Sequence, residues 1–426
     1  MADSRILPCI LTVLWAFSCN AKIGDVANDT GPLPDASVAQ ADSSAVGIAL
    51  PYTPSNIAAS AMSSGTAPLQ LRASDGAVEI DTDQGTITRL ADSEDLRPPG
   101  VVFASQVQGS GGINLAPLLG IFSASELVIE AGARVTVKGS AGLVFAIAGD
   151  VKVDGVVSAV GGLDTPNQAG PGGFAGGDPT TPNGGGLGGG QPGTDGAGGG
   201  GAGHVALGGK GGDRGELILG GAAGQPVLSE FLVPLMGGSG GGLGSSDDNP
   251  DESGLGGGGG GVVQISALGS IRIGATGGIN CGGGGGQGGV RESGGGGAGA
   301  GGAILLEAME IAVFGILAAN GGGGGGGANG NDPGASGQTG SLSAVAAPAG
   351  KRVGDGAAGG LGGAGGDEEG LPGVDADIAN AGTKYAGGGG GSGGRIHLRS
   401  VDDGIKVDGI ASPKDGVTEG TLVDDD

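Results

Sequence analysis

The amino-acid sequence predicts an all-β protein, a parallel β-helix or solenoid-like stack of short strands with long glycine-rich inserts. The first observation behind this fold class is a repeated module in which apolar residues alternate and a glycine turn follows. Its copies are VTVKG at 135–139, VKVDGV at 151–156, IRIGATGGI at 271–279, IAVFGI at 311–316 and IKVDGI at 405–410. The second is the irregular spacing of these copies, which requires inserts of very different length.

Glycine dominates the composition, with 110 of 426 residues, while aromatic residues make up 2%. A chain of this kind can bury thin aliphatic stripes but no bulky aromatic core. Because there is no strict Gly-X-Y period, collagen is excluded. The glycine runs are expected either to pack as left-handed extended helices of the polyglycine type or to form open loops, and both alternatives stand.

The chain begins with the features of a signal peptide at residues 1–18. Arg5 precedes an apolar run from Ile6 to Phe17 that is too short to span a bilayer. The run ends in Ser18 and Cys19, and Ala16 to Cys19 resembles a bacterial lipobox, in which the cysteine is acylated. We therefore predict lipidation at Cys19, with ordinary cleavage and secretion as the alternative.

The remaining chain divides by composition into five parts. Residues 19–66 are rich in Ala, Ser, Asp and Pro, and they predict a lipid-anchored flexible tether. Residues 67–100 predict a small β-hairpin cap, and residues 101–162 the first strands of the stack. Residues 163–394 form the glycine-rich region with embedded strand modules, and 395–426 the final strands and an acidic tail.

Side-chain alternation predicts which residues face the core. Residues two apart on a strand share one face, so Lys152, Ala312 and Lys406 should point outward. The residues expected to share the inward face are Val151, Val153, Ile311, Val313, Ile405 and Val407.

Motifs for nucleophilic or phosphate chemistry are not convincing. The G-x-S-x-G pattern occurs at Ser239 and Ser392, but glycine-rich sequence produces it by chance. Only His204 and His397 are present, and we expect His397 to face solvent. We therefore predict no enzyme activity, no cofactor and no catalytic residues.

Carboxylates are the residues best able to carry chemistry in this sequence. Stacked strands could align Asp150, Asp154, Asp402, Asp403 and Asp408 as a carbohydrate site, although Asp-Gly is also ordinary turn chemistry. A second group, Asp247, Asp248, Asp251 and Glu252, offers weak calcium ligands. It lacks the spacing of known calcium loops, so solvation is the favoured role and no metal site is predicted.

Several glycine-rich stretches carry a family resemblance. They are GGFAGGD at 172–178, the run at 294–327 that contains AILLEAMEIAVFGI, and GGGGGSGGRIHLRS at 387–400. Over residues 101–400 the chain resembles the glycine-rich, PE-PGRS-like surface lipoproteins of myxobacteria. The resemblance implies a surface lipoprotein and no particular activity. The helical Pro-Glu domain that begins the mycobacterial PE-PGRS proteins is absent here.

These observations predict a non-enzymatic cell-envelope protein with a structural or adhesive role, an outer-membrane lipoprotein at the cell surface. Its expected partners are the membrane, through the lipid, and extracellular matrix, other cells or its own copies. The formal net charge of −25 argues against nucleic acid, which is bound through Lys and Arg. The alternative is a carbohydrate-binding or carbohydrate-cleaving β-helix protein, which the scarcity of aromatic residues disfavours.

The anchor can be tested at Cys19. We expect mass spectrometry of the mature N-terminus to show an acylated cysteine, because each buried methylene of the acyl chains contributes about 0.8 kcal/mol to membrane residence. The Cys19→Ala variant should then leave the membrane fraction. An unmodified terminus, or a Cys19→Ala protein that still fractionates with membranes, would contradict the lipoprotein assignment.

Overall fold

The computed structural model describes residues 50–108, 116–227, 231–246, 249–351, 353–354, 371–379, 385–401 and 403–422. The chain divides into two compact units, residues 1–48 and 49–426, and the described residues all belong to the second. The signal peptide and Cys19 therefore lie outside the described residues. Within them, the structure contains twenty strands and four short 3-10 helices. The helices are η1 (Ala59–Ser63), η2 (Ala73–Asp75), η3 (Pro250–Glu252) and η4 (Lys414–Gly416).

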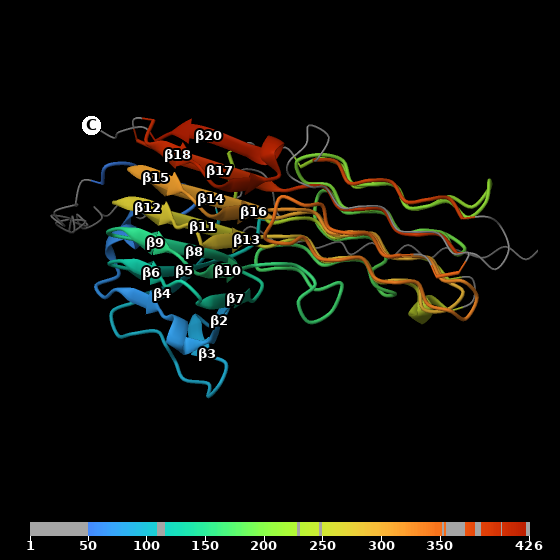
Figure 1. Ribbon diagram of the computed structural model, residues 1–426, viewed down its shortest axis with the longest axis horizontal. Helices are drawn as coiled ribbons and strands as arrows, with labels where there is room; N and C mark the ends of the chain where they lie inside the picture. The colour runs from blue at the N-terminus through green and yellow to red at the C-terminus, as the bar shows by residue number, and fades with distance from the viewer. Residues whose placement is uncertain are drawn as a thin grey trace, which may run out of the picture. The chain divides into compact units, whose positions relative to one another are not determined.

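The strands form three large sheets (Figure 1). The first sheet has the order β1 (Leu69–Leu71), β6 (Leu127–Ile129), β9 (Val151–Val153), β12 (Ser270–Ile273), β15 (Glu310–Val313) and β18 (Ile405–Val407). The second has the order β19 (Ile410–Ser412), β16 (Ile316–Ala318), β13 (Gly278–Asn280), β10 (Val156–Ser158), β7 (Arg134–Lys138), β2 (Ala77–Asp81) and β3 (Thr86–Arg89). The third has the order β20 (Val417–Thr421), β17 (Arg395–Ser400), β14 (Ala303–Ala308), β11 (Val262–Ala267), β8 (Gly142–Ile147), β5 (Leu119–Ala124) and β4 (Val102–Gln106).

The predicted fold class, a parallel β-helix or solenoid-like stack, is wrong. Two of the three sheets are mixed rather than parallel: β3 pairs antiparallel with β2, and β4 pairs antiparallel with β5. The reversal has a local cause, because β2 and β3 are joined by a tight turn in which Gly85 takes a positive φ of 67°. Both antiparallel strands lie at one end of their sheets, where they cover the edge that a purely parallel pairing would leave open.

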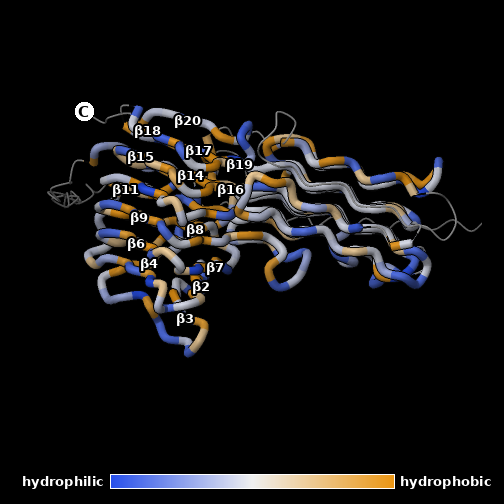
Figure 2. The backbone as a smooth tube through the Cα atoms, viewed as in Figure 1, coloured by the Kyte–Doolittle hydropathy of each residue, from blue (hydrophilic) through white to orange (hydrophobic). Residues whose placement is uncertain are grey.

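The three sheets enclose one aliphatic core. Apolar and polar residues alternate along strands of the first sheet such as β9 and β15, so one face of each of these strands is buried (Figure 2). In the third sheet, β5, β8, β11 and β14 are buried on both faces. The predicted inward face is confirmed: Val151, Val153, Ile311 and Val313 are buried, while Ile405 and Val407 pack at the edge of the same core. Three phenylalanines add the core's aromatic contacts; the Phe103 and Phe122 ring centroids are 5.0 Å apart, and Phe122 and Phe145 are 6.2 Å apart.

Long excursions leave the sheets at one repeated position. Residues 159–261, 281–302 and 319–394 each connect a strand of the second sheet to the next strand of the third. Their glycine-rich segments run side by side, away from the strands (Figure 1). The irregular spacing of the strand modules is thereby explained, because the extra residues all enter at the same connection.

The described glycine-rich segments of the excursions adopt the extended, hydrogen-bonded conformation and not the open-loop alternative, as segment 294–302 shows. The amides of Gly295, Ala298 and Gly301 donate to the carbonyls of Ala386, Gly389 and Ser392, each at 2.9 Å. The amides one residue later, of Gly296, Gly299 and Gly302, donate to Gln287, Gly284 and Cys281. The remaining amides, of Gly294, Gly297 and Ala300, donate to Ser245, Gly242 and Ser239. Every third amide thus points to the same neighbour, as in a left-handed helix with three residues per turn.

The same segment also accepts hydrogen bonds from three further segments, at 199–202, 254–260 and 322–325. It is therefore surrounded by six neighbouring segments, and its backbone is hydrogen-bonded on all sides. Such packing requires glycine, since a Cβ on Gly299 would collide with the carbonyl of Gly258, and one on Gly297 with the carbonyl of Gly200. The backbone hydrogen bonds offset the entropy that ordered glycine loses. We call the described glycine-rich segments of the three excursions, within residues 159–261, 281–302 and 319–394, the glycine bundle.

The alternation of the core can be tested on β15. Val313 is fully buried, whereas Ala312 lies outward in register between Arg272 and Lys406. We expect Val313→Asp to lower the free energy of unfolding by roughly 3–5 kcal/mol, because it buries an unpaired charge. Ala312→Asp should change it by less than about 0.5 kcal/mol, because it places a carboxylate near two exposed cations. Chemical denaturation measures both, and equal losses would contradict the register.

The glycine bundle can be tested by adding a single methyl group. Gly299→Ala should lower the free energy of unfolding by about 2–3 kcal/mol, because the new Cβ meets backbone that cannot move alone. Gly420→Ala in β20 is the matched control, since its Cβ would find no atom closer than 3.5 Å. Thermal unfolding of the two variants decides the matter; a Gly299→Ala protein as stable as the control would show that the segments pack loosely.

Candidate functional site

The structure does not bring Asp150, Asp154 and Asp408 of the predicted carbohydrate site together. Asp154 and Asp408 follow equivalent strands of the first sheet, β9 and β18, which are separated by β12 and β15. Three strand spacings place them about 14 Å apart. Asp150 lies at the opposite end of β9 from Asp154, about 13 Å away along the strand. A pair of glycosidase carboxylates works at roughly 5–9.5 Å, so these residues form no such pair.

Asp150, Asp154 and Asp408 each have a local partner. Asp154 and Asp408 form ion pairs of 2.8 Å with Lys152 and Lys406 on the same strands. Asp150 accepts hydrogen bonds from the backbone amide and hydroxyl of Ser270, and these bonds lower the pKa of its carboxyl group. Asp403 is exposed in the turn before β18, and Asp402 lies outside the described residues. Turn chemistry and surface pairing account for these positions.

Two of the four calcium candidates lie among the described residues. Asp251 and Glu252 belong to η3, whereas Asp247 and Asp248 lie outside the described residues. Glu252 pairs with Arg291 at 3.6 Å, and Asn249 caps the helix by accepting from the amide of Asp251. In the part of the chain that the structure describes, no three His, Cys, Asp or Glu side chains gather to hold a metal ion.

The serines of the two G-x-S-x-G patterns are buried in the glycine bundle. Ser239 Oγ accepts a hydrogen bond from the amide of Gly188, and Ser392 Oγ accepts one from the amide of His204. The contact between Ser392 and His204 therefore involves the histidine backbone and not its imidazole. Both hydroxyls accept from backbone amides of neighbouring segments.

The expectation that His397 faces solvent is wrong. It lies on the outer face of β17, but segment 231–236 covers that face, and the imidazole is 2% exposed. Its Nδ1 lies 2.7 Å from Thr418 Oγ1, and the Phe231 ring stands edge-on at 6.1 Å. Burial, with a smaller contribution from Arg399, lowers the pKa of His397 to about 4, so the ring is neutral near pH 7.

A buried polar cluster that sequence reasoning missed lies on the outer face of the third sheet. Its centre is Glu307, whose side chain is fully buried and pairs with Arg399 at 3.0 Å. The carboxylate also accepts from the hydroxyl of Ser266 at 2.9 Å and from the amide of Ser55 at 3.0 Å. The hydroxyl of Tyr52 donates to the backbone carbonyls of Ala267 and Glu307, and burial raises its pKa.

This cluster fastens residues 50–57 to the sheet, although the sequence assigned them to the tether. Ser266, Glu307 and Arg399 stand side by side in register on β11, β14 and β17. The sequence signal for this cluster is that three aliphatic strands each carry a polar residue at the same position. The carboxylate of Glu307 is fully buried and accepts hydrogen bonds from several donors, so the cluster serves as a structural clamp rather than a reaction centre.

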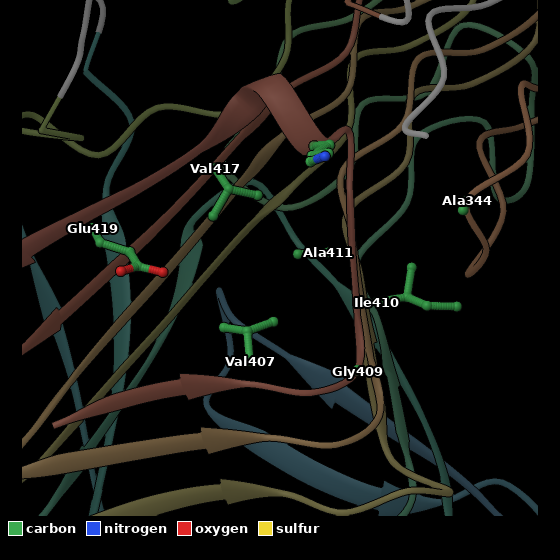
Figure 3. A pocket seen from close by; sticks show the side chains of 8 residues that line it. Ala344, Val407, Gly409, Ile410, Ala411, Val417 and Glu419 are labelled. Atoms are coloured by element: carbon green, nitrogen blue, oxygen red, sulfur yellow. The ribbon is translucent and has the colours of Figure 1, made fainter. Parts of the chain in front are cut away.

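A hollow of about 400 Å³ opens where the three sheets end, at β18, β19 and β20. Figure 3 shows Val407, Ala411 and Val417 pointing into it, with Glu419 at its side. These apolar residues belong to the margin of the central core. The hollow is the uncovered end of that core, and its charged lining residues are Lys414 and Glu419.

Turns at the far end of the glycine bundle carry exposed polar side chains (Figure 1). Three of these turns contact one another. The amide of Val290 and the hydroxyl of Ser293 both donate to the backbone carbonyl of Glu252. The amide of Glu292 donates to the backbone carbonyl of Gly330. Their exposed side chains include Asp251, Asn331 and Asp332. We call residues 249–253, 290–293 and 329–333 the bundle tip.

Comparison with known proteins adds no relative: no family model matches the chain, and neither a curated protein nor a solved structure shows significant similarity. Among the described residues, no helix has the length and apolar character needed to cross a bilayer.

Proposed function

We propose that this protein is a non-enzymatic component of the cell envelope, anchored by a lipid on Cys19, with a structural or adhesive role. The observation that carries the proposal is the glycine bundle. Its segments bond backbone to backbone in several directions and hold the bundle tip on an ordered support. An ordered array of this kind suits a spacer that presents polar loops at a distance from its base.

The surface chemistry supports contact rather than turnover. Asp154 and Asp408 are separated by about 14 Å. Ser239 and Ser392 pair with backbone amides, and both histidines are buried. The tip offers amide and carboxylate groups on turns, which make many weak contacts with polar surfaces such as matrix polysaccharide or other cells. A carbohydrate-cleaving role has no comparable structural support.

The proposal predicts that the bundle tip makes the contacts. The combined variant Asp251→Ala, Asn331→Ala and Asp332→Ala should lower binding to cells or matrix by about three- to tenfold, as expected from the loss of a few exposed polar contacts. A matched variant removes the same groups near the sheets, through Gln70→Ala, Glu126→Ala and Asp415→Ala. Binding is measured with purified protein on immobilised cells, and circular dichroism checks that both variants fold.

Equal binding by the two variants would show that the tip is not the contact surface. The purified protein should also leave a panel of polysaccharides and esters unhydrolysed. Turnover that is abolished by Asp154→Asn or Asp408→Asn would overturn the non-enzymatic assignment.

A further inference from the structure

We infer that the outer face of the third sheet rests on the lipid surface to which the protein is anchored. This inference deepens the proposed function and depends on its lipid anchor. Residues 50–65 and 231–236 cover this face of the sheet, and their apolar side chains pack in a second core with β5, β8, β11 and β14. The layer formed by these two segments, together with Val107 and Leu118, is called the covering layer.

The covering layer presents apolar side chains to the outside. Along 231–236, Leu232 and Leu235 are buried against the sheet, whereas Phe231 is 65% and Val233 58% exposed. Val107 is 76% exposed and lies between Gln106 and Gln108. The side chain of Gln106 donates to the carbonyl of Asn56 at 2.8 Å, and that of Gln108 donates to the carbonyl of Leu235 at 2.8 Å. These two contacts place Val107 where the two covering segments meet.

The charge distribution singles out this face. The whole chain carries a formal charge of −25, yet residues 50–71, 98–125 and 231–246 contain no Asp, Glu, Lys or Arg. Charged side chains on the third sheet's outer face come from Arg395, Arg399 and the sealed Glu307. An acidic protein is repelled by anionic headgroups and loses hydration energy when its charges approach a bilayer. A nearly uncharged face with protruding Phe and Val side chains is suited to the interface region of a bilayer.

The position of the chain's first described residues points to the same partner. Leu50 packs against the second core, and Tyr52 and Ser55 are clamped to β11 and β14 by the Glu307 cluster. The chain from Cys19 therefore joins the folded unit on this face. A lipid on Cys19 would hold this face close to the bilayer, where a weak apolar contact is strengthened by its high effective concentration.

The inference is tested without the lipid, on the mature chain from residue 19 carrying Cys19→Ala. An environment-sensitive fluorophore is attached at Val233→Cys or Val107→Cys, while the native Cys281 is buried and does not react. With phosphatidylcholine vesicles we expect a blue shift and higher emission at both positions. The control is Leu217→Cys, which is 93% exposed but lies on the glycine bundle, and its label should not respond.

A second measurement uses unlabelled protein. Phe231→Ser with Val233→Ser should lower vesicle partitioning by about tenfold, because it removes most of the protruding apolar area. Leu217→Ser with Leu219→Ser removes similar exposed area from the bundle and should leave partitioning unchanged. Both pairs are exposed, so circular dichroism should remain that of the parent protein.

The inference is overturned if the labels at Val233 and Val107 do not respond to vesicles, or respond no more than the label at Leu217. It is also overturned if they shift without vesicles while sedimentation shows a dimer, because a second copy would then cover the face. Mass spectrometry of Cys19 in the native protein separates the two proposals. An unmodified Cys19 would contradict the lipid anchor alone. An acylated Cys19, together with labels that do not respond on the Cys19→Ala chain, would contradict the membrane-facing surface alone.

Discussion

Hydrogen bonding between backbones that carry no side chains is the interaction on which most of this structure depends. An isolated glycine chain gains nothing by becoming ordered, since it has no side chain to bury and loses the most conformational freedom. In segment 294–302 the loss of conformational entropy is offset, because successive amides bond to three different neighbouring segments and six segments surround it in all. Order in the bundle is therefore collective, and no segment could maintain it alone.

The collective character explains how the bundle and the sheets depend on each other. The excursions start and finish at strands whose register is fixed by an aliphatic core, as at Ser158 and Val262. The strands thus fix the position at which each glycine segment leaves the sheets and the direction in which it starts. The hydrogen bonds of the bundle in turn pair the backbone groups of the connections between the second and third sheets.

The sequence predicted the strands better than it predicted their assembly. Alternation in VKVDGV, IAVFGI and IKVDGI correctly identified the buried valines and isoleucines, because a two-residue period is a local property. The antiparallel strands β3 and β4 were beyond that signal, since pairing direction depends on turns and distant partners. The Glu307 cluster was missed for a similar reason: Ser55 and Glu307 are 252 positions apart in the chain. The threefold repeat of amide partners has a sequence signal in GASGQTG at 334–340, where glycine recurs every third residue.

The single exit point of the glycine excursions has a consequence for how such a chain can change. Residues 159–261 and 281–302 span the same step between sheets, although the first contains many more out-and-back passes than the second. Passes can accordingly be added or removed in pairs at this corner while every strand keeps its neighbours. Gain or loss of such pairs would then alter the thickness of the glycine bundle without disturbing the core that holds the protein together.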